Sequence, residues 1–144
     1  MTYFKLYTDR LRASGLRPTK QRIAVCKILF NRKETFHFTI EQLKKITEKY
    51  EKTKISLATL YNTVHAFQKK GYLKEIPLKG NQTFFDTNTN SHHHFYDEDT
   101  SQLIDIKDEN IHLNNLPHVP KEKKIKDIEI TIKVVSNNQK QKNS

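Results

Sequence analysis

The sequence predicts an α+β fold with a helical first half that ends in a β-hairpin and a smaller second half built mainly of strands. Three patterns support this class. Apolar residues recur with helical spacing up to residue 71, short β-type runs flank a turn at residues 79–81, and apolar and polar residues alternate over residues 128–134. With 144 residues, the chain suits one domain or two small ones and leaves no room for a large multidomain enzyme.

Two helices are expected before residue 31. The first covers residues 3–13 and ends before Gly15, and the second begins at Pro18 and Thr19, which suit a helix start. Their predicted inward stripes consist of Phe4, Tyr7, Leu11, Ile23, Cys26, Leu29 and Phe30. Cys26 is the single cysteine, which excludes an internal disulfide and a multi-thiolate metal site, and its place on the stripe favours burial over reactivity.

Capping signals also mark a third and a fourth helix. Residues 39–42, Thr-Ile-Glu-Gln, form a capping box, and a turn over residues 51–55 leads to Ser56, which can cap a helix ending at Gly71. The predicted inward residues are Ile40, Leu43, Ile46 and Tyr50 in the third helix and Leu57, Leu60, Val64 and Phe67 in the fourth. The predicted outer face of the fourth helix consists of Thr59, Asn62, Thr63, Ala66, Lys69 and Lys70, and Tyr61 lies at the edge between the two faces.

Residues 72–76 and 83–85 are the two short β-type runs of the hairpin. Helix, turn, helix and hairpin in this order are typical of a winged helix, in which the second helix of the pair enters the DNA major groove. Short polar side chains on the outer face of the fourth helix suit that role, although a solvated face is the alternative.

The charge of the chain is concentrated in its first half. The whole chain has 26 Lys and Arg against 16 Asp and Glu, a net charge of +10. Residues 1–86 hold 18 basic and 7 acidic residues, a net charge of +11, whereas residues 87–144 hold 8 and 9, a net charge of −1. Nucleic acid is therefore the first partner to expect for the first half.

Composition also suggests where the chain divides. Residues 87–91, Thr-Asn-Thr-Asn-Ser, are expected to form a hinge between a domain at residues 1–86 and another at residues 92–135, and residues 136–144 are expected to be a disordered tail. No apolar run approaches the roughly 18 residues of a membrane span. We therefore expect a cytoplasmic protein without a membrane partner.

A histidine cluster occupies the start of the second half, where residues 91–99 are Ser-His-His-His-Phe-Tyr-Asp-Glu-Asp. On a strand, alternation places His92 and His94 on one face and His93 on the other. Two imidazoles at this spacing can converge on one ion. Three exposed histidines on a polar loop are the alternative.

Carboxylates near this cluster can complete a mixed nitrogen and oxygen site. Asp86 precedes the hinge and Asp105 lies on a strand expected at residues 103–106, so the set suits Zn, Fe or Mn. Heme bound by a histidine beside Phe95 and Tyr96 is a further possibility. The remaining histidines, His65, His112 and His118, are expected to be surface or packing residues, whereas His37 matters only if the fold carries it to the hinge.

Residues 128–134 alternate strictly and predict a strand with one apolar face. Two or three strands are too few to be stable alone, so we expect the second half to pair with another copy of the chain. A homodimer with two-fold symmetry also suits palindromic double-stranded DNA.

Four segments together resemble the ferric uptake regulator (Fur) family. Residues 15–22, 55–63, 69–73 and 92–94 match it in that order, and the resemblance covers residues 5 to about 106. Its members are dimeric winged-helix transcription regulators, not enzymes, whose C-terminal domain dimerises and binds metal at the hinge. The resemblance implies an α+β fold with an N-terminal winged-helix DNA-binding domain followed by a small α/β dimerisation domain.

The resemblance assigns roles to particular residues. Tyr61 and Asn62 match base-contacting positions, and Arg17 matches a basic residue that enters the minor groove. Asn62 replaces the common arginine and favours adenine where arginine favours guanine. With the outer-face residues, the expected DNA-binding set is Arg17, Thr59, Tyr61, Asn62, Lys69 and Lys70. The expected metal set is His37, Asp86, His92, His94 and Asp105.

Departures from the family pattern point to one branch. Residues 97–100, Asp-Glu-Asp-Thr, replace a Cys-x-x-Cys pair, so a four-cysteine structural zinc is not expected, and residues 110–124 replace the usual C-terminal helix. With the triple histidine, these features resemble the iron response regulator (Irr) branch, whose members sense heme. Lys27 follows Cys26, so a Cys-Pro heme motif is absent and heme would depend on His92, His93 and His94.

The resulting hypothesis is an iron- or heme-responsive regulator, mainly a repressor, that binds AT-rich operator DNA as a homodimer. Heme or a divalent Fe, Mn or Zn ion at the histidine site would modulate DNA affinity. A Fur-type metal-dependent repressor without heme sensing is the alternative. A small metallohydrolase is a third possibility, which the absence of a nucleophile elbow, a glycine-rich loop and a partnered general base disfavours.

Overall fold

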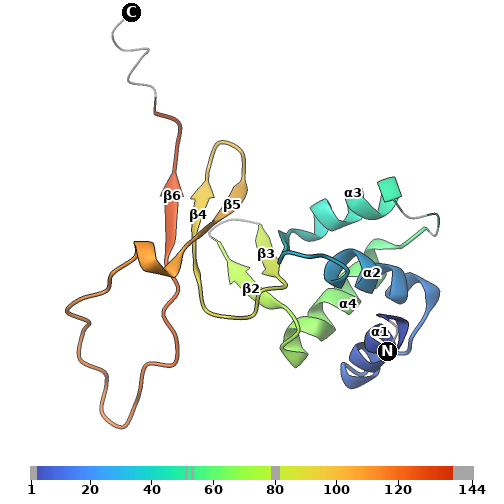
Figure 1. Ribbon diagram of the computed structural model, residues 1–144, viewed down its shortest axis with the longest axis horizontal. Coiled ribbons are helices and arrows are strands. Elements are labelled where there is room, and N and C mark those ends of the chain that lie inside the picture. The colour runs from blue at the N-terminus through green and yellow to red at the C-terminus, as the bar shows by residue number, and fades with distance from the viewer. Residues whose placement is uncertain (1–2, 51, 53, 79–81, 138–144) are drawn as a thin grey trace, which may run out of the picture. The chain divides into compact units, whose positions relative to one another are not determined.

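A computed structural model of the protein describes residues 3–50, 52, 54–78 and 82–137. The chain forms two compact units, Met1–Thr89 and Asn90–Ser144. Helices are concentrated in the first unit, and the second combines strands with irregular chain (Figure 1). The predicted α+β class is therefore confirmed. No helix within the described ranges has the length and apolar character needed to cross a bilayer.

The described part of the first unit contains helices whose ends follow the predicted signals. They are α1 (Tyr3–Ala13), α2 (Lys20–Phe30), α3 (Ile40–Tyr50) and α4 (Leu57–Lys70). The side chains of Thr19 and Ser56 accept hydrogen bonds from backbone N–H groups in the first turns of α2 and α4. Thr39 and Gln42 exchange the two bonds of the capping box, both 3.1 Å long. Gly71 ends α4 with a φ of 92°, which favours glycine.

An antiparallel sheet completes the winged helix. In the described residues, β3 (Thr83–Asp86) lies between β1 (His37–Phe38) and β2 (Lys74–Pro77). The first hairpin strand thus begins and ends slightly later than residues 72–76, the range that the sequence predicts. The hairpin turn predicted at residues 79–81 lies outside the described residues, as does part of the turn predicted at residues 51–55.

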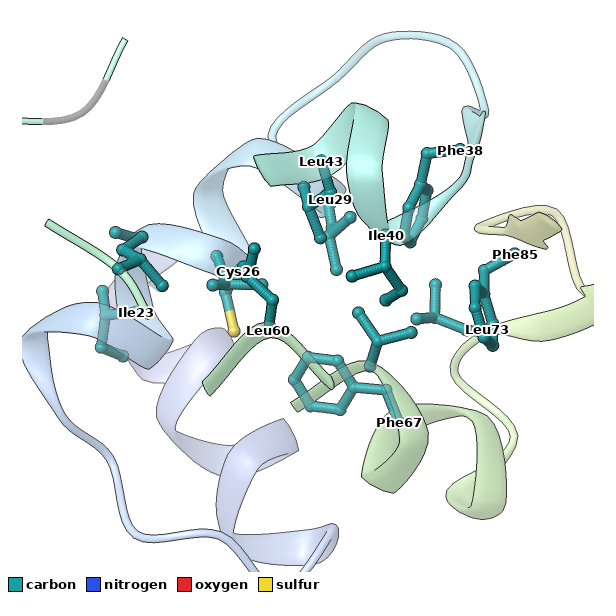
Figure 2. Packing of buried hydrophobic residues seen from close by; sticks show 14 of the residues in the cluster. Ile23, Cys26, Leu29, Phe38, Ile40, Leu43, Leu60, Phe67, Leu73 and Phe85 are labelled. Atoms are coloured by element: carbon teal, nitrogen blue, oxygen red, sulfur yellow. The ribbon is translucent and has the colours of Figure 1, made fainter. Parts of the chain in front are cut away.

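The core of the first unit forms between α4 and the other helices, with β3 at one side (Figure 2). Leu60, Val64 and Phe67 of α4 are each 0% exposed. Their buried neighbours from other elements include Leu11, Cys26, Leu29, Leu43 and Phe85. This arrangement fixes which side of α4 faces solvent, because side chains three and four residues apart share one face of a helix.

Four side chains differ from their predicted positions. Phe4, Tyr50 and Leu57 are predicted to face the core but are 62%, 67% and 46% exposed. Each lies in the first or last turn of its helix, where the apolar stripe has passed the edge of the core. Thr63 is predicted to face outward but is buried, and its hydroxyl donates to the Thr59 carbonyl. This local bond satisfies the hydroxyl inside the core.

Cys26 is fully buried, as the sequence predicts. Burial raises the pKa of its thiol to about 12. The reactive thiolate is therefore not formed near neutral pH, and the side chain acts as a small apolar group.

The second unit contains a mixed sheet in its described part. β4 (His93–Asp97) pairs antiparallel with β5 (Gln102–Ile106) and parallel with β6 (Thr131–Val134). β6 is shorter than the strand predicted at residues 128–134, although the Ile130 carbonyl still accepts the His94 N–H. Residues 107–130 are irregular apart from a 3₁₀ turn, Asp108–Asn110.

One face of this sheet is apolar and partly exposed. The register aligns Phe95 with Ile104 of β5 and Ile132 of β6, so these three side chains share a face. Ile104 is 49% exposed and Ile132 is 40% exposed. Large apolar side chains grouped in this way are typical of a surface that packs against a partner.

The burial of α4 can be tested by a pair of substitutions. Leu60→Ala should lower the free energy of unfolding by about 2–5 kcal/mol, because it removes buried methyl groups and leaves a cavity. Leu57→Ala, one turn earlier, should lower it by less than about 1 kcal/mol, because Leu57 is partly exposed. Urea unfolding followed by circular dichroism measures both values. Equal losses in the two variants would contradict the burial described for α4.

Candidate functional site

Three side chains of the second unit, His92, His94 and Asp105, converge on one point. His94 in β4 lies opposite Asp105 in β5, and His92 directly precedes β4. Asp105 Oδ1 is 3.1 Å from His94 Nε2 and 3.6 Å from His92 Nε2. The centres of the two imidazole rings are 4.3 Å apart. Alternation along the chain thus brings the two imidazoles together.

His93 has a different environment. Its Nδ1 accepts the backbone N–H of Ile130 at 2.9 Å, so it helps to attach the chain before β6 to β4. In β4 it alternates with His94 and therefore belongs to the opposite face of the sheet. Of the three consecutive histidines, His92 and His94 therefore converge on one point, whereas His93 forms a hydrogen bond with the backbone.

Hydrogen bonding fixes the tautomer of His92. Its Nδ1 is 2.8 Å from the carbonyl oxygen of Asn90, which can only accept, so Nδ1 carries a hydrogen. In the neutral ring, the lone pair of Nε2 is then directed toward the Asp105 carboxylate. In that form, a cation between the imidazole nitrogen and the carboxylate would be attracted by both groups.

The trio fits a metal ion. Nitrogen and oxygen ligands lie about 2.0–2.2 Å from zinc, so two ligand atoms of a tetrahedral ion are roughly 3–3.5 Å apart. The ligand atoms of the trio lie within 4.8 Å of one another, close enough for small side-chain rotations to complete the geometry. Imidazole nitrogen with carboxylate oxygen suits Zn, Fe or Mn.

The first unit supplies a second nitrogen and oxygen pair on neighbouring strands. Asp86, the last residue of β3, is the cross-strand partner of His37 in β1. Asp86 is 1% exposed, and its carboxylate accepts the N–H of Asn88 at 2.8 Å. A buried carboxylate is stabilised by such bonds and by nearby cations. The predicted metal set thus consists of a pair in one unit and a trio in the other.

The acidic turn at residues 97–100 is held by hydrogen bonds. Asp97 Oδ1 accepts the N–H groups of Asp99 and Thr100 at 2.9 and 3.3 Å. Asp99 Oδ2 accepts the N–H of Ser136 at 2.6 Å, and the bonds from Ser136 lower the pKa of Asp99. Ser136 belongs to the predicted disordered tail, of which residues 138–144 lie outside the described residues.

The outer face of α4 carries most of the predicted DNA-contacting residues. Its exposed members are Tyr61, Asn62, Lys69 and Lys70. Thr59 is half-buried, and its hydroxyl is hydrogen-bonded to the Ser56 hydroxyl at 2.9 Å. The face presents the Tyr61 ring and the Asn62 amide near its middle and two lysine ammonium groups at its end. Amide groups of this kind contact base edges, and ammonium groups contact phosphates.

Arg17 lies in the loop that precedes α2, and its side chain is exposed. The Arg17 carbonyl accepts a hydrogen bond from the Arg22 guanidinium at 2.8 Å. This bond restrains the loop backbone, so the Arg17 side chain extends into solvent from a fixed position.

His65 has a packing role that involves a predicted site residue. Its ring centre is 5.7 Å from that of Tyr61, with an 80° angle between the rings, and 5.9 Å from that of Phe85. His65 therefore supports the Tyr61 ring from the next turn of the helix. The four-residue spacing is the one sequence signal that could have indicated this contact.

Comparison with known proteins settles the family. A family model described as "Ferric uptake regulator family" matches residues 13–135. The chain belongs to this family. Its members are transcriptional regulators and not enzymes, which removes the metallohydrolase alternative.

One relative with a known function also matches the chain. The peroxide-responsive repressor PerR of Staphylococcus saprophyticus is 32% identical over 96 residues, which are 67% of this chain and 63% of the relative. The match thus spans less than two thirds of that relative.

Solved structures confirm the fold. The ferric uptake regulator of Pseudomonas aeruginosa with manganese has a TM-score of 0.64 and 19% identity, over 91% of this chain and 98% of the other. That of Francisella tularensis with iron has a TM-score of 0.66 and 15% identity, over 86% and 94%. A winged-helix domain followed by a small α/β domain is therefore the fold of this chain.

Metal binding by the trio can be tested with His94→Gln. Removing one of three converging ligands should weaken Zn²⁺ binding by at least about 100-fold, because losing an outer partner of a metal ligand already costs 10–100-fold. His118→Gln, at an exposed histidine in irregular chain, is the matched control and should bind like the wild type. Calorimetric titration of chelator-treated protein measures the affinities. Unchanged affinity in His94→Gln would place the ion elsewhere.

Proposed function

We propose that the protein is a metal-responsive transcription regulator, mainly a repressor, that binds operator DNA in the cytoplasm as a homodimer. The observation that carries this proposal is the outward face of α4, which presents Tyr61, Asn62 and two lysines from the half of the chain with a net charge of +11. A winged helix with such a face is built to place that helix in the major groove.

DNA contacts follow from the chemistry of these side chains. The Asn62 amide suits the paired donor and acceptor of adenine, which supports a preference for AT-rich operators. Lys69 and Lys70 suit phosphates, and Arg17 suits the minor groove beside the recognition helix. Tyr61 contributes an aromatic ring that His65 holds in place.

The metal is proposed to take ligands from both units. His92, His94 and Asp105 form the trio, and His37 and Asp86 form the pair. When bound, the ion would act as a positive centre that links its ligands. This role requires no redox or hydrolytic chemistry. Ligands drawn from two units would favour one arrangement of the DNA-reading helix and so change DNA affinity. Iron and manganese are supported by the structural neighbours described with those metals.

The dimer interface is proposed to involve the apolar face of the second unit. Phe95, Ile104 and Ile132 form a strip across three strands, and two of them are at least 40% exposed. Covering such a strip with a second copy would remove apolar area from water. Two-fold pairing would present two recognition helices to a palindromic operator.

Heme is the second candidate ligand, in keeping with the resemblance to the iron response regulator branch. The specific observation in its favour is that His93 and Phe95 are both partly buried and, two residues apart in β4, belong to the same face of the sheet. A histidine ligand beside aromatic surface suits a porphyrin. The bond from Ile130 to His93 Nδ1 leaves Nε2 of that ring as its one candidate axial atom.

The DNA-binding proposal is tested on an operator selected from random duplex DNA in the presence of Mn²⁺. Asn62→Ala should weaken binding to that operator by about 10–100-fold, because a bidentate base contact contributes about 1–3 kcal/mol. Binding to unrelated DNA should not change. Asn114→Ala, at an exposed position in the second unit, is the control and should match the wild type in a gel-shift titration. Equal binding by Asn62→Ala and the control would contradict the assigned face.

The same gel shift distinguishes the two ligands. A metal-dependent regulator should bind its operator only after Mn²⁺, Fe²⁺ or Zn²⁺ is added to chelator-treated protein. A heme sensor should bind without metal and lose binding when heme is added, and heme addition should produce a Soret band that His93→Ala abolishes. Tight binding by metal-free protein together with release by heme would contradict the metal-dependent form of the proposal.

A further inference from the structure

A cavity of about 310 Å³ lies in the first unit, beside the ends of α2 and α4, and none of its lining residues belongs to the predicted metal set. We call it the Arg10 pocket, and its lining includes Arg10, Phe30, Arg32, Lys33, Tyr72 and Thr87. The volume is at the lower end of the range for small-molecule sites. Neither the DNA-binding nor the metal-binding proposal uses this pocket.

The Arg10 guanidinium lies over two aromatic rings. Its central carbon is 4.4 Å from the centre of the Phe30 ring and 5.4 Å from that of Tyr72. These cation–π contacts restrain the guanidinium, and its N–H groups can still donate hydrogen bonds. Within the described residues, no carboxylate forms an ion pair with Arg10, and its side chain is only partly exposed.

A second guanidinium reinforces the positive charge. Arg32 lies 3.7 Å from the centre of the Phe36 ring, and its Nε donates to the Ile28 carbonyl at 2.7 Å. Burial lowers the pKa of Arg32, so its charge is partly removed from water. With Lys33, three cations line the pocket, and Glu34 is the one carboxylate among its lining residues.

Hydroxyl groups add further donors. Thr87 Oγ1 accepts the Phe36 N–H at 2.9 Å, so the hydroxyl hydrogen of Thr87 remains able to donate. Thr35 and Thr89 also line the cavity. The lining therefore combines guanidinium and hydroxyl donors with aromatic and leucine side chains, so it can contact both an anionic group and an apolar one.

We propose that the Arg10 pocket binds a small organic anion. Its carboxylate or phosphate oxygens would contact Arg10 and the threonine hydroxyls, and its apolar body would lie against Phe30 and Tyr72. A planar guanidinium matches either oxyanion with two parallel hydrogen bonds. Thr87 and Thr89 directly precede the junction of the two units, so an occupied pocket would order the chain that leads into the second unit.

The pocket is tested by titrating the full-length ¹⁵N-labelled protein with benzoate, inorganic phosphate and uncharged benzyl alcohol. Benzoate or phosphate should produce saturable amide shifts around residues 30–35 and 87, and benzyl alcohol should not. A stronger response to benzoate identifies a carboxylate on an apolar body, and a stronger response to phosphate identifies a phosphate ester. Either of these two results supports the site.

Substitution separates the pocket from general anion binding. Arg10→Gln should weaken binding by about 10-fold or more, because it removes a charge-assisted hydrogen bond. Arg12→Gln, an exposed position on the same helix with the same change of charge, should leave binding unchanged. If Arg10→Gln fails to fold, the positions of the amide shifts in the wild-type protein still show whether the anion binds in the pocket. Shifts confined to Lys69 and Lys70, equal weakening in both variants, or no saturable shift would overturn the proposal.

Discussion

The burial of one side of α4 is the constraint on which the rest of the first unit depends. Leu60, Val64 and Phe67 are packed among the other helices and β3, so neither rotation nor sliding of α4 is possible without opening the core. The same packing directs Asn62 and Tyr61 outward. The proposed DNA-binding surface therefore lies on a rigid helix rather than on a loop, which favours a precise geometry.

The elements with local signals were predictable from the sequence. Thr19, Ser56 and the Thr39–Gln42 pair mark helix starts by hydrogen bonds that close within one turn, so the sequence alone indicates them. The apolar periodicity gave wrong predictions at helix ends, because it does not show where the core stops. Leu57 fits the apolar stripe of α4 but is exposed. The periodicity also placed Thr63 outside, because a bond to the carbonyl of Thr59 is not visible as a polarity pattern.

The candidate sites show the same division between local and long-range information. Alternation places His92 with His94, but the distance to Asp105 depends on the register of β4 with β5, which the sequence does not specify by itself. The bond from Ile130 to His93 joins residues 37 positions apart, and no spacing rule predicts it. The Arg10 pocket is similar, because Arg10, Phe30 and Tyr72 meet only after three helices have packed.

The net charge of +11 in the first half has two physically different components. Lys69 and Lys70 are exposed and hydrated, so their attraction for phosphates is long-range and strongly reduced by salt. Arg10 and Arg32 lie against aromatic rings and are partly removed from water, so salt screens them less and their geometry matters more. The first component suits a polyanion of any sequence. The second suits an anion of defined shape, and a count of charges along the sequence cannot separate the two.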